Sequence, residues 1–444
     1  MKKFTSPKLA KKVILRDPVH GTISITDQVV FDILQSREFQ RLRRIKQLGP
    51  IAFVFPGATH TRFEHNLGVY ELTRRICDTF EEKYAGEDEN LWNPDNRLLV
   101  EVAGLLHDLG HGPYSHTFEH LFGTNHELMG QKIILDPRTE VNQALLKVDP
   151  EFPKAVASVI AKTYPDPKVV KMISSQADAD RMDYLQRDAY YTGVSYGSFD
   201  MSRILQVIRP YKDGICFTEN GMHAVEDYIV SRYQMYQQVY FHKVGRSTEV
   251  ILHHLLERAK KDYEEGIIMA TPSLAAFLEG KWDLTDYLDL NDGVMETNFT
   301  MWTHAKDPIL ADLASRYLFR KPLTSVKVVG DKKKLVTKLK SLIEEAGFDP
   351  AYYTAINSMF DQPYDAYKPT GKNANSQIEI MEDDGTLIEL SKMSPLVEAL
   401  DGTLQGDERF YFPKTMLGSE NDPQIFEPIY RQFQEHVHNG YLVE

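Results

Sequence analysis

Histidine is the residue whose distribution along the chain points most directly to chemistry. Seven of the 15 histidines fall between residues 60 and 126, where an even spread over the chain would place only about two. An adjacent pair, His107-Asp108, stands at the end of an apolar segment and directly before the turn Leu109-Gly-His-Gly-Pro. Imidazole and carboxylate groups are ligands for borderline divalent ions, and clustered imidazoles carry protons near neutral pH. The pattern predicts a metal centre with acid–base groups beside it.

Two further segments can complete the ligand set of such a metal. Arg62-Phe-Glu-His65 places His65 one helical turn after Arg62, so that both side chains share a face. The segment from Asp178 to Asp183 supplies carboxylates, one of which can be a further ligand. A single His-Asp dipeptide is most often a helix end, and a single acidic segment is most often a solvated face. The order His, His-Asp, Asp, each in a helical context, favours the metal site.

Most of the chain before residue 320 has the apolar periodicity of helices that could carry these groups. The segment from Asn96 to His107 is apolar on nearly every side, which predicts a buried helix. The segments Arg62–Glu82 and Val225–Tyr263 predict long helices with mixed faces. Strand-like pieces are few, and Gly214–Thr218 is one of them.

The pattern changes near residue 320. Thr324–Gly330 alternates like a strand, and Lys333–Ala346 predicts an amphipathic helix that stops at Gly347. Asn375–Leu390 predicts two strands joined across an Asp-Gly turn. We therefore predict a mainly α protein, with a helical catalytic region over residues 1–320 and a smaller α+β unit over residues 321–444. No motif assigns a role to the smaller unit.

Composition narrows the class of protein. There are 51 Lys and Arg residues against 64 Asp and Glu, a formal net charge of −13, which argues against a sequence-independent nucleic-acid coat. No apolar run approaches the roughly 18 residues of a membrane span, and the start of the chain does not read as a signal peptide. Two cysteines cannot build a disulfide framework. A protein of the cytoplasm, without membrane or nucleic-acid partners, is expected.

The longer strings around these residues resemble a known family. Four strings carry the resemblance: Arg16-Asp-Pro-Val-His-Gly, Gln40–Leu48, Phe55–Val69 and Ala103–His116. They are similar to the motifs of the HD-domain deoxynucleoside triphosphate triphosphohydrolases (dNTPases), which include the mammalian SAM-and-HD-domain enzyme and bacterial homologues. The resemblance runs from about residue 12 to residue 320 and implies an HD-domain helical core.

The resemblance also implies roles for individual residues. His65, His107, Asp108 and Asp180 are implied as the metal ligands. Arg62, His111, His116 and His126 would then face the substrate phosphates, with Glu119 behind His116. A histidine suits protonation of the departing ribose oxygen, and we expect His116 in that role, with His126 or His111 as alternatives. The resident ion could be Fe, Mn, Zn, Co or Ni, and Mg²⁺ would accompany the phosphates.

Contacts to the rest of a dNTP are implied in the same way. The resemblance assigns the sugar to Tyr184 and Asp188, with Gln47 at the 3′-hydroxyl. Asp180, Tyr184 and Asp188 share one helical face by their spacing. A second set would hold the phosphates and the base: Arg181, Arg232, Tyr236 and Tyr240. Arg181 stands where the family has Lys, which keeps the charge and changes the donor geometry.

Regulated members of the family bind nucleotide effectors where subunits meet in a tetramer. Parts of those effector sites are matched by Gln40, Arg43, Arg209, His242 and Lys243. Gln35 replaces an Asp that recognises guanine in the family, so the sequence does not predict GTP as the activator. Base preference and the activating nucleotide stay open, while a homotetramer is expected.

Two other functions remain open at this stage. The same metal site could serve another phosphoester, either a nucleoside monophosphate or a guanosine polyphosphate. Alternatively, the chain could sense nucleotides with a vestigial site. The released product separates the enzymes, because only a dNTPase of this kind releases inorganic triphosphate.

Overall fold

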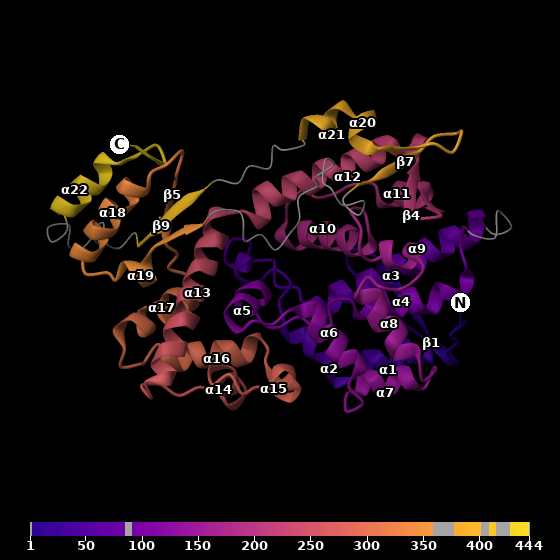
Figure 1. Ribbon diagram of the computed structural model, residues 1–444, viewed down its shortest axis with the longest axis horizontal. Helices are drawn as coiled ribbons and strands as arrows, with labels where there is room; N and C mark the ends of the chain where they lie inside the picture. The colour runs from indigo at the N-terminus through magenta and orange to yellow at the C-terminus, as the bar shows by residue number, and fades with distance from the viewer. Residues whose placement is uncertain (1, 85–90, 358–376, 401–407, 414–426, 444) are drawn as a thin grey trace.

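The fold is mainly helical, as the sequence predicts, and begins with a β-hairpin (Figure 1). The computed structural model describes residues 2–84, 91–357, 377–400, 408–413 and 427–443. Strands β1 (Lys8–Asp17) and β2 (Gly21–Asp27) pair antiparallel and close the hairpin. This hairpin is not among the elements predicted from the sequence. Among the described helices, none is long and apolar enough to cross a lipid bilayer.

A group of helices follows the hairpin and carries most of the predicted site residues. These elements are α1 (Gln28–Gln35), α2 (Arg37–Arg41), η1 (Leu42–Arg44), η2 (Gly49–Phe53), α3 (Arg62–Tyr84), η3 (Pro94–Asn96), α4 (Arg97–Leu106), α5 (Ser115–Phe122), α6 (His126–Leu135), α7 (Glu140–Leu146), α8 (Phe152–Ile160), α9 (Pro167–Lys171), α10 (Ala179–Thr192) and α11 (Met201–Val207).

Helix α4 lies at the centre of this group, which is why its sequence is apolar all round. Every residue from Leu98 to Leu106 is buried, and α3 and α8 pack against the helix. Close approach of α3 to α10 depends on Gly68, because a Cβ at that position would lie 1.8 Å from a carboxylate oxygen of Asp183. The glycine thus lets the helix that carries His65 meet the helix that carries Asp180.

The middle of the chain continues with helices around a short pair of strands. Its elements are β3 (Ile208–Tyr211), β4 (Gly214–Thr218), η4 (Glu219–Gly221), α12 (Met222–Met235), η5 (Tyr236–Tyr240), α13 (Lys243–Glu264), α14 (Pro272–Leu278), α15 (Leu284–Asp289), α16 (Asp292–Trp302) and α17 (Pro308–Leu318).

One predicted helix is wrong as a single element. The segment Val225–Tyr263 divides into α12 and α13, because a π-helical turn at Tyr236–Tyr240 is followed by an extended residue, His242. A π-turn widens the helix and shifts the direction of the side chains that follow it, and such turns are frequent at functional sites. Arg232, Tyr236 and Tyr240 therefore do not continue onto the face that begins at Lys243.

The C-terminal strands join two sheets at opposite ends of the molecule (Figure 1). Their elements are β5 (Thr324–Lys327), α18 (Lys333–Glu345), α19 (Pro350–Tyr353), β6 (Ala355–Asn357), β7 (Glu379–Met381), β8 (Leu387–Glu389), α20 (Leu390–Met393), α21 (Pro395–Leu400), β9 (Arg409–Phe412), α22 (Glu427–Glu435), β10 (Val437–His438) and β11 (Tyr441–Leu442).

The predicted hairpin and amphipathic helix of this region are both present. Strands β7 and β8 pair antiparallel across a turn with Gly385 at φ +86°, although residues 375 and 376 of the predicted hairpin lie outside the described residues. The hairpin extends the β3–β4 pair through parallel pairing of β7 with β4. The other strands form the sheet β10-β11-β5-β9-β6, whose buried side chains pack with α18 and α22. The boundary at residue 320 stays a prediction.

A buried carboxyl at the start of α16 supports the segment that leads to Gln47. Asp292 Oδ2 accepts the N–H of Lys46 at 3.0 Å, while Oδ1 has no hydrogen-bond partner in the described part of the chain. Burial outweighs that hydrogen bond and raises the pKa of Asp292 to about 6. Ionised Asp292 should therefore cost the folded protein stability at neutral pH.

Replacing Asp292 with Asn should stabilise the protein in a pH-dependent way. In the wild type, between about pH 4 and 6 the unfolded carboxyl ionises while the folded one keeps its proton, so stability falls by up to about 3 kcal/mol as pH rises. Above the folded pKa the penalty is constant. Urea unfolding of Asp292→Asn and wild type should show a gap at about pH 7.5 that narrows by about pH 4.5. A gap of equal size at both pH values would contradict the pKa assignment.

Candidate metal centre and active-site cavity

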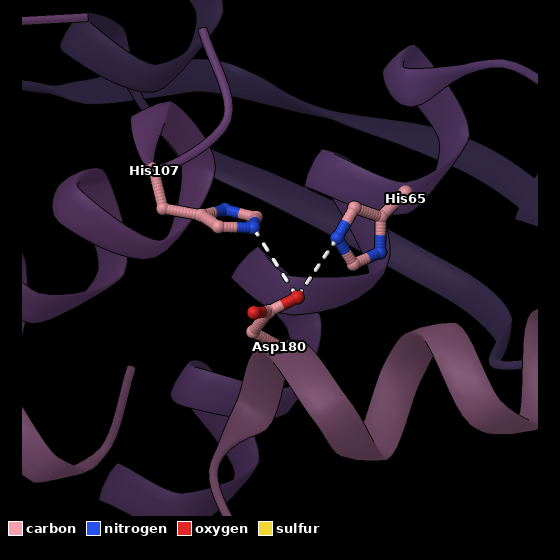
Figure 2. Close-up of side chains that lie close together, drawn as sticks. All are labelled: His65, His107 and Asp180. Carbon is pink, nitrogen blue, oxygen red and sulfur yellow. Dashed lines mark hydrogen bonds and ion pairs between the residues drawn. The ribbon is translucent and has the colours of Figure 1, made fainter. Parts of the chain in front are cut away.

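Three predicted metal ligands converge from three helices (Figure 2). The Asp180 Oδ1 atom, from α10, lies 3.1 Å from Nε2 of His65 in α3 and 3.5 Å from Nε2 of His107 at the end of α4. Metal bonds of about 2.0–2.2 Å place neighbouring ligand atoms roughly 3.0–3.6 Å apart. The three side chains therefore already stand at the spacing of a shared ion.

Asp108, the fourth predicted ligand, borders the same point. Its carboxylate oxygens lie 3.4 Å from Nε2 of His107 and 3.7 Å from Nε2 of His65. One of them also accepts a hydrogen bond from Arg62. The carboxylate of Asp108 therefore contacts both the candidate ligand set and Arg62, the residue that the resemblance assigns to the phosphates.

The electrostatics of the site favour a positive charge at its centre. Burial alone would lower the pKa of His65, but hydrogen bonds with Asp180 and Asp183 raise it to about 10. For Asp180 the directions are reversed: burial alone would raise its pKa, but the imidazoles of His107 and His65 lower it. Nε2 of His107 is buried and has no hydrogen-bond partner among the described residues, which leaves a lone pair for an ion. The donor set, two imidazoles and two carboxylates, fits a borderline divalent cation.

Asp183 orients this centre from behind, a role that the sequence analysis does not assign to it. Its carboxylate accepts from Nδ1 of His65 at 2.7 Å, so that Nε2 of His65 points at Asp180. It also contacts His20 at 2.6 Å and Arg187 at 2.9 Å, and Arg187 in turn contacts Asp17. Partners of this kind fix the tautomer and orientation of a ligating histidine.

The predicted acid–base groups form a second cluster. The rings of His111 and His126 stack with centroids 4.0 Å apart, and Nδ1 of His126 lies 2.9 Å from Oε1 of Glu119. Burial, together with nearby Arg62, holds the pKa of His111 well below its usual value. The side chain of His116 lies outside the described residues, so the expected role of Glu119 behind it is not tested. Among described residues, Glu119 instead pairs with His126.

A cavity of about 710 Å³ opens beside the metal ligands. Arg62 connects the two, because it contacts Asp108 and also lines the cavity. Gln47, Glu119 and Tyr240, all predicted site residues, line it as well. The volume is within the range of small-molecule sites.

The residues predicted to hold sugar, phosphates and base lie close together and are mostly buried. Tyr184 and Tyr236 approach with their hydroxyl oxygens 3.3 Å apart, and the rings of Tyr236 and Tyr240 meet edge to face. Arg232 donates to Gln176, and Arg181 donates to Asp178. The two arginines are therefore held in place by residues of the chain itself.

Asp188 makes contacts that the sequence analysis does not predict. One oxygen lies 2.7 Å from Nε2 of His60, and the other accepts from the hydroxyl of Tyr240 at 2.7 Å. His60 stacks on Tyr191. The carboxylate is fully buried, and each of its oxygens already has a partner within the chain.

The predicted effector residues lie on separate parts of the fold. Gln40 and Arg43 contact each other near α2 and η1. Arg209 lies on β3, whose partner β4 is far from α2 in Figure 1. His242 and Lys243 stand at the start of α13. The three groups thus belong to different elements, and their joint role stays a prediction.

Two residues that the sequence analysis does not single out hold the turn after His107. Arg41 is fully buried and donates to the carbonyl oxygens of His111, Leu290 and Tyr287. The hydroxyl of Tyr287 donates to the carbonyl of Gly110 at 2.6 Å. Arg41 falls in the string Gln40–Leu48, but only the fold shows what it binds.

Comparison with known proteins agrees with this geometry. The HD domain family matches residues 62–188, and the HD associated region matches residues 199–415. These boundaries enclose all four candidate ligands within the first match. An HD domain implies divalent metal binding.

Relatives extend the likeness to nearly the whole chain. The uncharacterised Bacillus subtilis protein YwfO is 48% identical over 417 residues, covering 93% of this chain and 95% of YwfO. A Dictyostelium discoideum protein named as a deoxynucleoside triphosphate triphosphohydrolase SAMHD1 homolog is 34% identical over 56% of this chain and 49% of its own length. A solved phosphohydrolase from Bacteroides thetaiotaomicron superposes with a TM-score of 0.78 at 27% identity, covering 90% of this chain and 100% of that one. The chain therefore belongs to the HD-domain phosphohydrolases and is a hydrolase of that family.

Proposed function

We propose that the protein hydrolyses dNTPs to a deoxynucleoside and inorganic triphosphate. One observation carries the proposal: the ligand set His65, His107, Asp108 and Asp180 adjoins, through Arg62, a cavity large enough for a nucleotide. Curated relatives that carry the name dNTP triphosphohydrolase support the substrate class. The match covers only about half the length of each of these relatives, so the substrate remains part of the proposal.

The charge and position of each residue indicate its role in binding the metal or the triphosphate. A divalent ion bound to the ligand set would lower the pKa of a water molecule and polarise a phosphoryl oxygen. Arg62 would hold the α-phosphate beside that set, because its guanidinium contacts Asp108 and faces the cavity. Arg181 and Arg232, preordered by Asp178 and Gln176, would hold the rest of the triphosphate, which Mg²⁺ accompanies.

The reaction forms a bond from water oxygen to the α-phosphorus and breaks the bond from that phosphorus to the 5′-oxygen. The departing oxygen needs a proton. Of the histidines whose side chains are described, His126 is the better donor, because its Nδ1–H donates to Glu119 and the second proton of the charged ring is then released from Nε2. His116 stays in the proposal as an alternative donor.

Tyr184 is proposed to exclude ribonucleotides by contact with the sugar. Replacing Tyr184 with Ala should therefore raise the kcat/KM for ATP relative to that for dATP about tenfold or more, the scale on which pockets discriminate by fit. Tyr184→Phe is the matched control, because it keeps the ring and loses only the hydroxyl near Tyr236. Equal selectivity in wild type and Tyr184→Ala would remove Tyr184 from this role.

A nucleotide effector and a homotetramer in the cytoplasm complete the proposal. Gln40, Arg209 and Lys243 belong to three different elements, which is compatible with a site assembled between subunits. Size-exclusion chromatography with light scattering, run with and without dNTPs, would report the assembly directly.

The test of the reaction is a product assay. Protein of known metal content is incubated with each dNTP, alone and in pairs, with Mg²⁺ or Mn²⁺, and the products are separated by chromatography. Deoxynucleoside and inorganic triphosphate in equal amounts support the proposal, and turnover that needs a second nucleotide supports the effector. Orthophosphate from nucleoside monophosphates, or pyrophosphate from guanosine polyphosphates, with dNTPs untouched, would overturn it.

A further inference from the structure

A second group of metal-binding side chains lies on α13, outside the residues discussed so far. His253, His254 and Glu257 place one ligand atom each within 4.8 Å of one another. Nε2 of His253 lies 3.3 Å from Oε1 of Glu257, and Nδ1 of His254 lies 3.3 Å from Oε2. Each oxygen of a single carboxylate thus faces a different imidazole.

The tautomer of His254 is set by a contact with the C-terminal strands. Its Nε2 lies 3.2 Å from the carbonyl oxygen of Thr354, next to β6, and a carbonyl can only accept. The ring therefore carries its hydrogen on Nε2, and the lone pair on Nδ1 faces Glu257. A lone pair opposite a carboxylate oxygen requires a positive charge between them.

The distances favour a metal ion over a second proton. Charge-assisted hydrogen bonds are usually about 2.7–2.9 Å long, shorter than the 3.3 Å found for both imidazoles. Two ligands of a tetrahedral ion with bonds of about 2.0–2.1 Å stand roughly 3.3 Å apart.

The position of the group connects it to the cavity. His253 and His254 line the same cavity as Arg62, and His120 of α5 lines it too. The rings of His120 and His253 are 5.7 Å apart, and His120 is exposed enough to turn toward an ion. An ion at this place would have three protein ligands at hand and an open side toward the cavity.

We propose that His253, His254 and Glu257, with His120 as a further ligand, form a second site for a borderline divalent ion such as Zn²⁺ or Co²⁺. The ion ties α13 to α5 and, through His254, to β6. His120 takes the fourth coordination position, from which an oxyanion in the cavity can displace it. The site does not depend on the substrate proposed above, because its test measures metal uptake.

Co²⁺ is the probe, because tetrahedral Co²⁺ with nitrogen ligands absorbs visible light. The full chain, free of any affinity tag, carries His107→Ala and Asp108→Ala so that the first site gives no signal. Titration should show one Co²⁺ per chain with visible bands. Adding His253→Ala should weaken binding at least about 30-fold, since even loss of an outer partner of a metal site costs about 10–100-fold.

Two further variants separate loss of the metal site from loss of the fold. Glu257→Gln, at a partly exposed side chain, should weaken Co²⁺ binding with little risk to folding. His223→Ala is the matched control. His223 also faces a glutamate three residues further along the helix, Glu226. Among the described residues, however, His223 belongs to no group of three side chains that could hold an ion. Absence of Co²⁺ uptake in the protein with only this site, or affinity unchanged by both His253→Ala and Glu257→Gln, would overturn the proposal.

Discussion

Replacing His107 with Ala should abolish dNTP hydrolysis and remove the resident metal ion. His107 supplies one of the converging ligand atoms, and its buried Nε2 has no hydrogen-bond partner among the described residues. Activation of water and polarisation of phosphate by a metal contribute several kcal/mol, and each 1.36 kcal/mol is about tenfold in rate. We therefore expect kcat to fall at least about a thousandfold, with metal content by mass spectrometry falling in parallel.

The control for this variant is the replacement of a histidine that lies on the surface. His304→Ala should keep wild-type activity and metal content, because His304 is exposed and belongs to neither of the two proposed metal sites. Far-UV circular dichroism of both variants should match the wild type. Hydrolysis of dNTPs at more than a tenth of the wild-type rate by metal-depleted His107→Ala would contradict the assignment of the site.

Replacing Asp183 with Ala should weaken both the fold and the metal site. Asp183 is fully buried and contacts His65, His20 and Arg187. Burial opposes its ionisation, yet Arg187 and the two imidazoles hold its pKa well below the usual value. Breaking a buried ion pair costs about 3–5 kcal/mol, and loss of an orienting partner costs about 10–100-fold in metal affinity. Urea unfolding and competitive metal titration measure the two effects separately.

A surface carboxylate provides the comparison. Asp78 accepts from Arg74 and Arg97 at similar distances, but its side chain is 46% exposed. Asp78→Ala should cost less than about 1 kcal/mol, as exposed ion pairs do, and should leave metal affinity unchanged. If Asp183→Ala kept wild-type metal affinity, Asp183 would be a structural residue and no part of the metal site.

Spacing along helices made the metal site predictable. His65, His107 and Asp180 belong to three helices with apolar faces, and burial of those faces forces the ends of the helices together. Pattern also predicted the β7–β8 hairpin, because an Asp-Gly turn separates two alternating segments, and α18, because its apolar stripe ends at Gly347.

Long-range contacts were not predictable in the same way. The pairing of β7 with β4 joins residues about 160 positions apart in the sequence, and no local pattern specifies it. Arg41 and Asp183 look like ordinary charged helix residues until the fold shows that one holds the carbonyl of His111 and the other orients His65. The break between α12 and α13 was missed because Tyr236 to Tyr240 keeps an apolar pattern through the π-turn.

The most direct test of the central claim follows oxygen through the reaction. The enzyme, with its metal bound, is incubated with a dNTP and any required effector in oxygen-18 water, and the products are analysed by mass spectrometry. If water activated beside His65, His107, Asp108 and Asp180 attacks the α-phosphorus, one heavy oxygen enters each inorganic triphosphate and none enters the deoxynucleoside. Heavy oxygen in the deoxynucleoside, or its release in orthophosphate or pyrophosphate instead of triphosphate, would contradict the account.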